Sequence, residues 1–271
     1  MDLNLKGKVA IVTGAGRGIG RAIALAFAQE GAFVTVDDID AEVLKDVAQK
    51  IISLGSRSLA VRADVTKVDQ VGMMVNQTLE EFGNVDILVN NAGIVYDVVG
   101  PVARNLFVES GTEEWNKEID IILYGTLNCI KAVIGHMIKQ KSGRIVNISS
   151  DCGRTSLNLK GFSLYSAAKG GVIAVTRSIA MEVAEYGITV NTVSPGLVRA
   201  TRALLAEKMK ETKPKEYEYY KRIEQGTVGA IPLGRIGVPE DIAKLVVFLS
   251  SDASQWITGQ TYSVNGGQAM I

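Results

Sequence analysis

The stretch KVAIVTGAGRGIGRAIALAFAQEG, Lys8 to Gly31, contains the pattern that decides the fold. It opens with an apolar, β-branched run typical of a buried strand and ends in an apolar repeat of helical period. Between them lies TGAGRGIG, Thr13 to Gly20. Glycine lets the backbone turn tightly and approach a ligand, while the start of a helix offers unpaired N–H groups to a diphosphate. The stretch therefore predicts a strand, a phosphate-binding turn and a helix.

The same alternation continues along the chain. Strands alternate with helices, and the strands are apolar on both faces. This pattern indicates a parallel sheet that is covered by helices on both sides. We therefore expect a doubly wound α/β fold, Rossmann-like, with helices on both faces. Further strands are predicted at 32–38, 58–65, 85–93, 143–150, 188–196 and 260–267, and further helices at 40–55, 66–83, 113–141, 163–186 and 239–250.

No linker, repeat or low-complexity tract divides the 271 residues. We therefore expect a single domain over 1–271. The segment at about 199–226 departs from the alternation, because its charges are dense and it carries a cluster of three tyrosines. Its pattern fits a helical excursion, which either covers a substrate site as a lid or forms a solvated face.

Composition excludes several classes of protein. Hydrophobic residues make up 47% and charged residues 21%, as in an ordinary globular protein. Lysine plus arginine and aspartate plus glutamate number 29 each, so no net positive charge is available to bind nucleic acid. The apolar runs are strand-sized, short of the roughly 20 residues of a membrane helix, and the N-terminus lacks a signal-peptide pattern. We expect a cytoplasmic protein with no membrane or nucleic-acid partner.

Cysteine and histidine are too scarce for several kinds of site. Cys129 and Cys152 are the two cysteines and are far apart in the sequence, so neither a disulfide framework nor a zinc site is indicated. His136 is the single histidine, near an expected helix end, where it does not fit a Ser-His-Asp triad or a multi-histidine metal site. We therefore expect no metal.

Asp38 at the end of the second strand indicates which dinucleotide binds. It follows Gly20 at nearly the spacing of about 20 residues expected for a carboxylate that binds the adenosine ribose hydroxyls. A carboxylate there repels a 2′-phosphate, so we expect NAD as the cofactor. Arg17, inside the glycine turn, is the residue that would instead pair with the phosphate of NADP.

The stretch YSAAK places Tyr165 four residues before Lys169. Residues i and i+4 share one face of a helix, so both side chains can face one cleft. A nearby ammonium group favours the phenolate and lowers the tyrosine pKa from about 10, which suits proton exchange with an alcohol or carbonyl. Ser149 and Ser150 end the preceding strand. A serine hydroxyl there can form a hydrogen bond with the alcohol or carbonyl oxygen that exchanges a proton with Tyr165.

A series of motifs runs over nearly the whole chain, in the order TGAGRGIG, DILVNNAG, GRIVNISS, YSAAK, VNTVSPG, PLGRIGVPEDIA and ITGQTYSVNGG. In this order they resemble the short-chain dehydrogenase/reductase family. The resemblance implies a Rossmann-type fold with a seven-stranded parallel sheet and assembly as a homodimer or homotetramer. It also implies hydride transfer between a nicotinamide and a small-molecule secondary alcohol or ketone.

The resemblance also implies roles for individual residues. Tyr165 resembles the catalytic acid/base, and Lys169 resembles the group that lowers the pKa of that tyrosine. Ser150 resembles the residue that polarises the substrate oxygen, because the family motif is aligned by Gly153, three residues later. Asn90 belongs to the stretch that lines the adenosine side. The expected cofactor-binding residues are Gly14, Arg17, Gly18, Ile19, Gly20, Asp38, Asp64, Val65, Asn91, Ala92, Gly93, Tyr165, Lys169, Pro195, Gly196 and Val198.

The chain departs from the family pattern at a few places. Ile122 stands where the family has an asparagine, counted from Trp115 or from Gly125, which puts the usual proton relay from Lys169 to solvent in doubt. The segments before Trp115 and between Ser150 and Tyr165 are longer than usual. We expect 94–114 and 199–226 to shape the substrate pocket. Ala200 stands where a hydroxyl residue often contacts the nicotinamide.

Three functions remain open at this point. The leading hypothesis is an NAD-dependent dehydrogenase of a secondary alcohol or, in reverse, a ketone reductase. The alternative within the enzyme class is an NADPH-dependent 3-oxoacyl ketoreductase. A third reading, motivated by Ile122, is a non-catalytic NAD-binding subunit.

Overall fold

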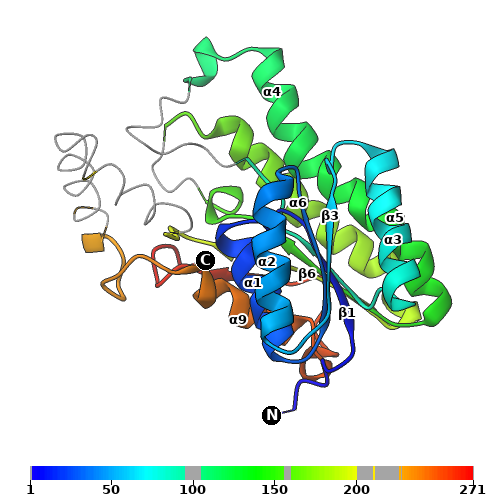
Figure 1. Cartoon of the computed structure of the whole chain (residues 1–271). Helices are drawn as coiled ribbons and strands as arrows, with labels where there is room; N and C mark the ends of the chain where they lie inside the picture. The colour runs from blue at the N-terminus through cyan, green and yellow to red at the C-terminus, as the bar shows by residue number, and fades with distance from the viewer. Residues whose placement is uncertain are drawn as a thin grey trace.

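A seven-stranded parallel sheet forms the centre of the protein (Figure 1). The structure is a computed structural model that describes residues 2–94, 105–155, 160–199, 210, 226 and 228–270. The order across the sheet is β3-β2-β1-β4-β5-β6-β7, with every neighbouring pair parallel. The strands are β1 (Val9–Val12), β2 (Phe33–Asp38), β3 (Ser58–Arg62), β4 (Ile87–Asn90), β5 (Gly143–Ile148), β6 (Ile188–Pro195) and β7 (Thr261–Val264).

Helices cover both faces of this sheet, so the expected doubly wound fold is confirmed. One face carries α1 (Gly18–Gln29), α2 (Ala41–Ser53) and α9 (Pro239–Leu249), and the other carries α3 (Val68–Phe82), α5 (Gly125–Gln140) and α6 (Ser163–Val183) (Figure 1). Each face has its own core of buried apolar side chains. The remaining described helices are α4 (Thr112–Ile119), a π-helical turn η2 (Asp120–Tyr124), and the short 3-10 helices η1 (Phe107–Glu109), η3 (Asp151–Gly153), η4 (Ala184–Tyr186) and η5 (Asp252–Ser254).

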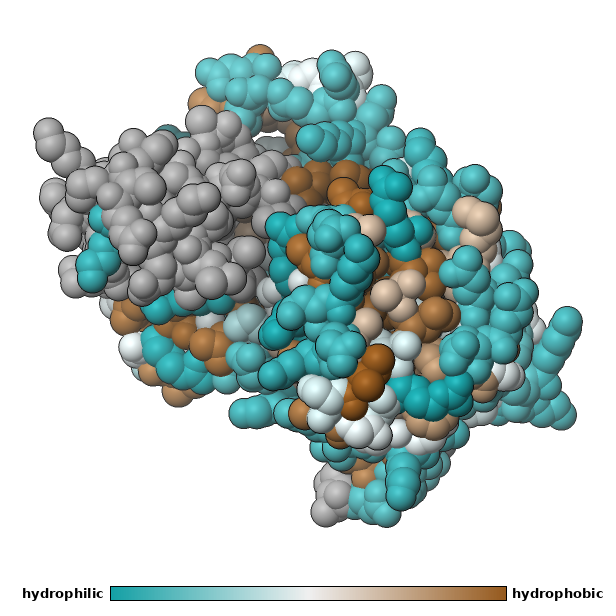
Figure 2. All heavy atoms as spheres, in the orientation of Figure 1, coloured by the Kyte–Doolittle hydropathy of each residue, from teal (hydrophilic) through white to brown (hydrophobic). Residues whose placement is uncertain are grey.

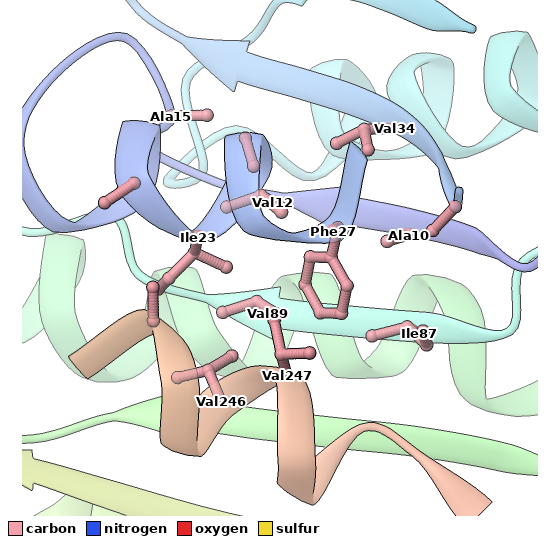
Figure 3. Close-up of a cluster of buried hydrophobic side chains, with 14 of the residues drawn as sticks. Ala10, Val12, Ala15, Ile23, Phe27, Val34, Ile87, Val89, Val246 and Val247 are labelled. Carbon is pink, nitrogen blue, oxygen red and sulfur yellow. The ribbon is translucent and has the colours of Figure 1, made fainter. Parts of the chain in front are cut away.

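Phe27 of α1 lies in the middle of the first core. Figure 3 shows its ring between side chains of β1, β4 and α9, including Ala10, Ile87 and Val247, and the ring is fully buried. This packing holds α1 flat on the sheet. The start of α1 therefore has a defined position at the carboxyl end of β1.

The order in which the chain adds strands to the sheet reverses between β1 and β4. From β1 the chain adds β2 and β3 on one side, and then β4 to β7 on the other. The loops after β1 and β4 therefore diverge, and this point of the carboxyl edge is where the ligand-binding crevice of an open α/β sheet is expected. The site described below lies at this edge.

The expected helix over 113–141 is interrupted. It forms α4, then the π-helical turn η2, then α5, and the Gly125 N–H donates to the carbonyl of Asp120, five residues earlier. Such single π turns within α-helices are frequent at functional sites. Ile122 lies in this turn and is fully buried. Residues 95–104 of the long loop after Gly93, and the expected helical excursion at 199–226 except residues 199, 210 and 226, lie outside the described residues.

The helical stretch Thr112–Gln140 is 29 residues long and contains an 18-residue window of mean hydropathy 1.5, so by length and composition alone it passes as a membrane span. The sequence analysis missed it because polar residues divide it into short apolar runs. In the structure the α5 part buries one stripe against the sheet, as the core helix of a globular domain does: Cys129, Ile130, Val133 and Met137. Figure 2 shows a largely hydrophilic surface with scattered brown patches on the face in view.

Candidate active site

The glycine turn after β1 is shaped so that larger residues do not fit. Gly14 and Gly18 have φ angles of +61° and +55°, in the left-handed region that favours glycine. A Cβ on Gly20 would lie 2.2 Å from the Gly14 carbonyl oxygen, and one on Gly16 would lie 2.2 Å from Cγ2 of Val43. At these two positions the backbone of the turn therefore lies so close to the neighbouring atoms that only glycine fits.

The N-terminus of α1 opens onto this turn. Its N-cap residue, Arg17, has extended backbone angles and makes no side-chain capping hydrogen bond. The first N–H groups of a helix need a partner, and an anion is a suitable one because the helix dipole is positive at that end. Ile19 packs in part against the core below and fixes the first turn. The glycine turn and α1 thus form a cradle that fits a diphosphate.

Thr13 and Asn91 tie the end of β4 to the glycine turn. The Thr13 hydroxyl accepts from the N–H groups of Asn91 and Ala92, each at 3.1 Å. The Asn91 amide in turn donates to the carbonyl oxygens of Thr13 and Gly14, at 2.9 and 3.0 Å. The expected NAG residues therefore adjoin the cradle. Sequence reasoning did not single out Thr13, whose role depends on a strand far along the chain.

Asp38 lies at the end of β2, beside the turn. Its Oδ2 accepts from the Gly16 N–H at 3.1 Å, and its Oδ1 accepts from the Asp40 N–H at 3.2 Å. Arg17 forms an ion pair with Asp40 at 2.8 Å. The guanidinium group that would bind a 2′-phosphate is thus already paired with a carboxylate, which leaves the Asp38 side of the crevice acidic.

Asp37 immediately precedes Asp38 in β2 and is buried. The sequence analysis assigned no role to it. Its Oδ1 accepts from the Ala63 N–H at 3.0 Å, so it joins the ends of β2 and β3. Burial raises the pKa of the Asp37 carboxyl to about 8. This residue holds the strand ends together next to the crevice.

The end of β3 forms a tight turn around Asp64. Its Oδ1 accepts from the Thr66 N–H at 2.9 Å and from the Thr66 hydroxyl at 2.8 Å. The carbonyl of the neighbouring Val65 accepts from the side chain of Asn128 in α5 at 2.9 Å. Asp64 and Val65 are therefore held at the carboxyl edge, on the same side of the crevice as Asp38.

Lys169 and Tyr165 share one face of α6. The Lys169 ammonium nitrogen lies 5.9 Å from the centre of the Tyr165 ring and donates to the Ile148 carbonyl at the end of β5, at 2.7 Å. Lys169 is only 5% exposed. Its burial lowers the pKa of the ammonium group to about 8, and the Glu118 carboxylate acts in the opposite direction. The group stays mainly protonated at neutral pH.

The structure distinguishes the two serines at the end of β5. Ser149 is buried and donates to the Lys169 carbonyl at 2.8 Å, so its hydroxyl holds α6 in place. Ser150 is partly exposed, and its hydroxyl accepts from the Cys152 N–H at 3.2 Å at the start of η3. A Cβ on Gly153 would lie 2.7 Å from the Lys169 carbonyl carbon, so glycine is what allows η3 to pack on α6.

Asp151 anchors the segment that carries Ser150. It is fully buried, and its two oxygens accept from Ser263 at 2.7 Å and from Asn265 at 2.5 Å. Arg154 donates to the same Ser263 hydroxyl at 2.6 Å. The turn after β5 is therefore fixed to β7 and the loop that follows it. Sequence reasoning missed Asp151, because its partners lie more than a hundred residues away.

We expect Asp151→Asn to lower both stability and turnover. An asparagine cannot accept from both Ser263 and Asn265, so one buried donor loses its partner at a cost of about 1 to 3 kcal/mol. Ser150 then moves, and we expect kcat to fall about tenfold. Thermal unfolding and initial rates with a ketone substrate would measure the two effects. Asp46→Asn is the control, because that carboxylate is largely exposed; equal results for both variants would contradict the anchoring role.

The chain after β6 closes the other end of the site. Gly196 donates to the Val264 carbonyl at 3.1 Å, and a Cβ there would lie 2.5 Å from Cβ of Asn265. Val198 pairs with Gly237 in an isolated bridge. Pro195 ends β6 beside β7, so these residues lie at the carboxyl edge near Ser150.

Ile122 and Glu118 complete the wall that faces α6. Ile122 packs in one apolar cluster with Ala168 and Val172, against which Tyr165 also packs. Glu118, one helical turn earlier, is 6% exposed. Burial raises the pKa of its carboxyl to about 7, and the Lys169 ammonium opposes that rise. Sequence reasoning missed Glu118, which stands in the charged stretch TEEWNKEI without a distinguishing mark.

Comparison with known proteins places these features in context. Residues 14–269 match the family described as Enoyl-(Acyl carrier protein) reductase. The chain is 41% identical over 271 residues to a 3-oxoacyl-[acyl-carrier-protein] reductase of Synechocystis sp., covering 98% of this chain and 99% of that one. It is 37% identical over 269 residues to the (2S)-[(R)-hydroxy(phenyl)methyl]succinyl-CoA dehydrogenase subunit BbsD of Thauera aromatica, covering 99% of each.

Solved structures give the same picture. A short-chain type dehydrogenase/reductase from Mycobacterium marinum superposes with a TM-score of 0.85 at 32% identity, covering 100% of this chain and 98% of that one. Levodione reductase superposes with a TM-score of 0.85 at 31% identity, covering 97% of this chain and 98% of that one. The resemblance extends over both the glycine turn and the face of α6.

Proposed function

The chain belongs to the short-chain dehydrogenase/reductase family, and on that premise we propose that it transfers a hydride between NAD and a secondary alcohol or ketone. As a member of that family it is an oxidoreductase that uses a nicotinamide cofactor. One observation carries the assignment of its site: Tyr165 and Lys169 share a face of α6, and α6 packs on the η3 turn that begins at Ser150, at the sheet edge that also holds the glycine cradle.

The residues present fit the cofactor. The cradle of Gly14 to Gly20 would hold the diphosphate, since a Cβ at Gly16 or Gly20 would fill it. Asp38 would bind the adenosine ribose hydroxyls, with Asp64 and Val65 beside the adenine. The Asn91 to Gly93 turn would line the adenosine side, and Pro195 and Gly196, followed by Val198, would lie near the nicotinamide. When bound, the nicotinamide supplies or accepts the hydride.

The proton is handled by the protein. In ketone reduction the Tyr165 hydroxyl donates its proton to the carbonyl oxygen, and in alcohol oxidation the Tyr165 phenolate accepts the hydroxyl proton. Ser150 donates a hydrogen bond to the same substrate oxygen and fixes its position. The Lys169 ammonium favours the phenolate form of Tyr165, and its hydrogen bond to the Ile148 carbonyl keeps it in place.

We propose NAD, rather than NADP, because the pocket beside the turn is acidic. Asp38 lies where a 2′-phosphate would have to fit, and Arg17, the nearby cation, is paired with Asp40. A phosphate would therefore be repelled by Asp38 and would also have to separate an existing ion pair. Both effects favour a ribose with free hydroxyls.

We expect NADH to bind at least tenfold more tightly than NADPH, and Asp38→Asn to remove most of that preference. The amide keeps the shape of the side chain and can still accept from the Gly16 N–H, but it no longer repels phosphate. A fluorescence titration of each cofactor would measure the affinities, and Asp46→Asn serves as the charge-matched control. Tighter binding of NADPH by the wild-type protein would reverse the cofactor assignment.

The alternative reading is an NADPH-dependent 3-oxoacyl ketoreductase. It is supported by the printed names of relatives from Synechocystis sp. and Staphylococcus epidermidis, each 41% identical and each a 3-oxoacyl-[acyl-carrier-protein] reductase. Rates with an acetoacetyl thioester and with simple ketones, each with both reduced cofactors, would separate the two. Preference for the thioester with NADPH favours the alternative. NADH binding without turnover of any substrate would favour the third reading, a non-catalytic NAD-binding subunit.

We further propose that the protein works in the cytoplasm as a homodimer or homotetramer. This assembly is typical of the family that the chain resembles. Light scattering of the purified chain would give its mass in solution. The substrate is proposed to lie against 94–114 and 199–226, most of which falls outside the described residues, so its identity rests on the substrate panel.

A further inference from the structure

The turn of helix between α4 and α5 has lost the polar side chain typical of the family. Ile122, in place of asparagine, is an aliphatic residue that is 1% exposed, and it packs with Ala168 and beside Tyr165. Such a side chain neither donates nor accepts hydrogen bonds. If Tyr165 exchanges protons with solvent through Lys169, another group has to take the proton from that ammonium.

Glu118 lies in the right place for this. It precedes Ile122 by four residues, so one helical turn separates them on the same side of the α4–η2 segment. The α4 helix packs directly on α6, which carries Lys169 (Figure 1). Glu118 is buried and feels the charge of Lys169, as Lys169 feels that of Glu118.

The surroundings of this pair are simple in the described part of the chain. From α6, Lys169 acts electrostatically on Glu118, and the phenol of Tyr165 packs against the Ile122 cluster. Asp120, on the adjoining η2, is exposed. On α4 itself the other charged side chains, Glu113, Glu114 and Lys117, are exposed. The carboxylate of Glu118 is therefore the acidic group that acts on the buried ammonium.

We propose that Glu118 is a proton-relay residue, which acts through Lys169 and carries protons between it and solvent in place of the asparagine that Ile122 replaces. The inference rests on the proposed function, because it needs Tyr165 to be the acid/base. Glu118 does not touch the reacting atoms. Its role is to accept and release the proton that Lys169 handles.

Each step conserves the proton. In alcohol oxidation the substrate hydroxyl proton passes to the Tyr165 phenolate, while the carbon gives up a hydride that the oxidised nicotinamide would accept. The Lys169 ammonium group gives a proton to the Glu118 carboxylate, and the resulting carboxyl group gives it to water. The Lys169 amine, now neutral, takes the proton of the Tyr165 phenol, which restores both the phenolate and the ammonium group. Ketone reduction runs these steps in reverse.

Burial brings the acidities of the two relay groups closer together. It lowers the pKa of Lys169 to about 8 and raises that of Glu118 to about 7. Both shifts favour transfer of a proton from the ammonium group to the carboxylate. An ordinary lysine and glutamate differ by about 6 pKa units, which would hold the proton on the lysine.

The test compares Glu118→Gln with Glu113→Gln, a matched control on the exposed side of α4. In weak buffer near pH 7 we expect Glu118→Gln to lower kcat at least tenfold, with KM and the NADH dissociation constant within twofold of wild type. Adding imidazole should restore most of the lost turnover, because a small buffer can take the proton instead. Glu118→Asp should keep part of the activity, and Glu113→Gln should match wild type.

A second readout does not depend on turnover. In the cofactor-free protein, infrared difference spectra between pH 6 and pH 8 should show a carboxyl band that ionises and that is lost in Glu118→Gln. Should that variant fail to fold, Glu118→Met is the reference, because its unbranched side chain also lacks a carboxyl group. The absence of any band that differs between wild type and the variant in this range overturns the proposal.

Kinetic outcomes can overturn it as well. Unchanged kcat and pH profile in Glu118→Gln, or a loss of activity that imidazole does not restore, means that Glu118 is structural. Failure of the proposed function looks different: wild type and Glu113→Gln would then bind NADH but reduce no ketone, while the infrared band would still be present.

Discussion

Tyr165→Phe is expected to lower kcat by about 100-fold to 10,000-fold while NADH binding stays within twofold of wild type. The substitution removes only the hydroxyl group that exchanges a proton with substrate. The ring keeps its edge-to-face contact with Phe162, at 5.8 Å between centroids, and its packing on the Ile122 cluster. The loss should therefore appear in the chemical step and not in stability. Initial rates over a panel of ketones and secondary alcohols would measure it.

Tyr186→Phe is the control, since Tyr186 lies in η4, past the end of α6, and packs against the core on the other face of the sheet from α1. It should match wild type in every assay. If Tyr165→Phe kept more than a tenth of the wild-type kcat, Tyr165 would not be the acid/base. The proton would then have to come from another group, and the relay through Lys169 and Glu118 would fall with it.

Gly20→Ala is expected to weaken NADH binding at least 100-fold and to lower the melting temperature by several degrees. The added Cβ would lie 2.2 Å from the Gly14 carbonyl oxygen and 2.4 Å from the Asn91 side-chain nitrogen. The Gly14 oxygen belongs to the backbone and cannot rotate away, so α1 has to move off the end of β1. Overpacking of this kind costs about 1 to 3 kcal/mol, and it displaces the N–H groups that would hold the diphosphate. Calorimetric titration and thermal unfolding would measure both losses.

Gly72→Ala supplies the matched control within α3. A Cβ at Gly72 meets nothing within 4 Å, and its backbone is helical. Alanine there should leave NADH binding unchanged and should raise stability by about 0.4 to 1 kcal/mol, because glycine in a helix costs conformational entropy. Similar behaviour of the two alanine variants would show that the close approach at Gly20 is not what shapes the cradle.

Much of the site follows from local pattern. TGAGRGIG is a continuous segment between an apolar strand and an amphipathic helix, so the turn, the start of α1 and the place of Asp38 were predicted correctly. Tyr165 and Lys169 share a face because one helix contains both, and that needs no tertiary information. The choice of Ser150 over Ser149 rested on family resemblance, and the hydrogen bond from Ser149 to Lys169 adds a physical reason for it.

The sequence by itself determined the order of strands and helices, the cradle and the spacing of the Tyr165 and Lys169 pair, because each depends on residues that are near neighbours in the chain. Tertiary structure decided the rest. Asp151 meets Ser263 and Asn265 only when β5, β6 and β7 lie side by side. Glu118 reads as one more acid in a charged helix until α4 packs on α6, the helix that carries Lys169, and buries it. The roles of these two carboxyl groups depend on burial and on contacts between distant parts of the chain. Neither can be predicted from the spacing of neighbouring residues.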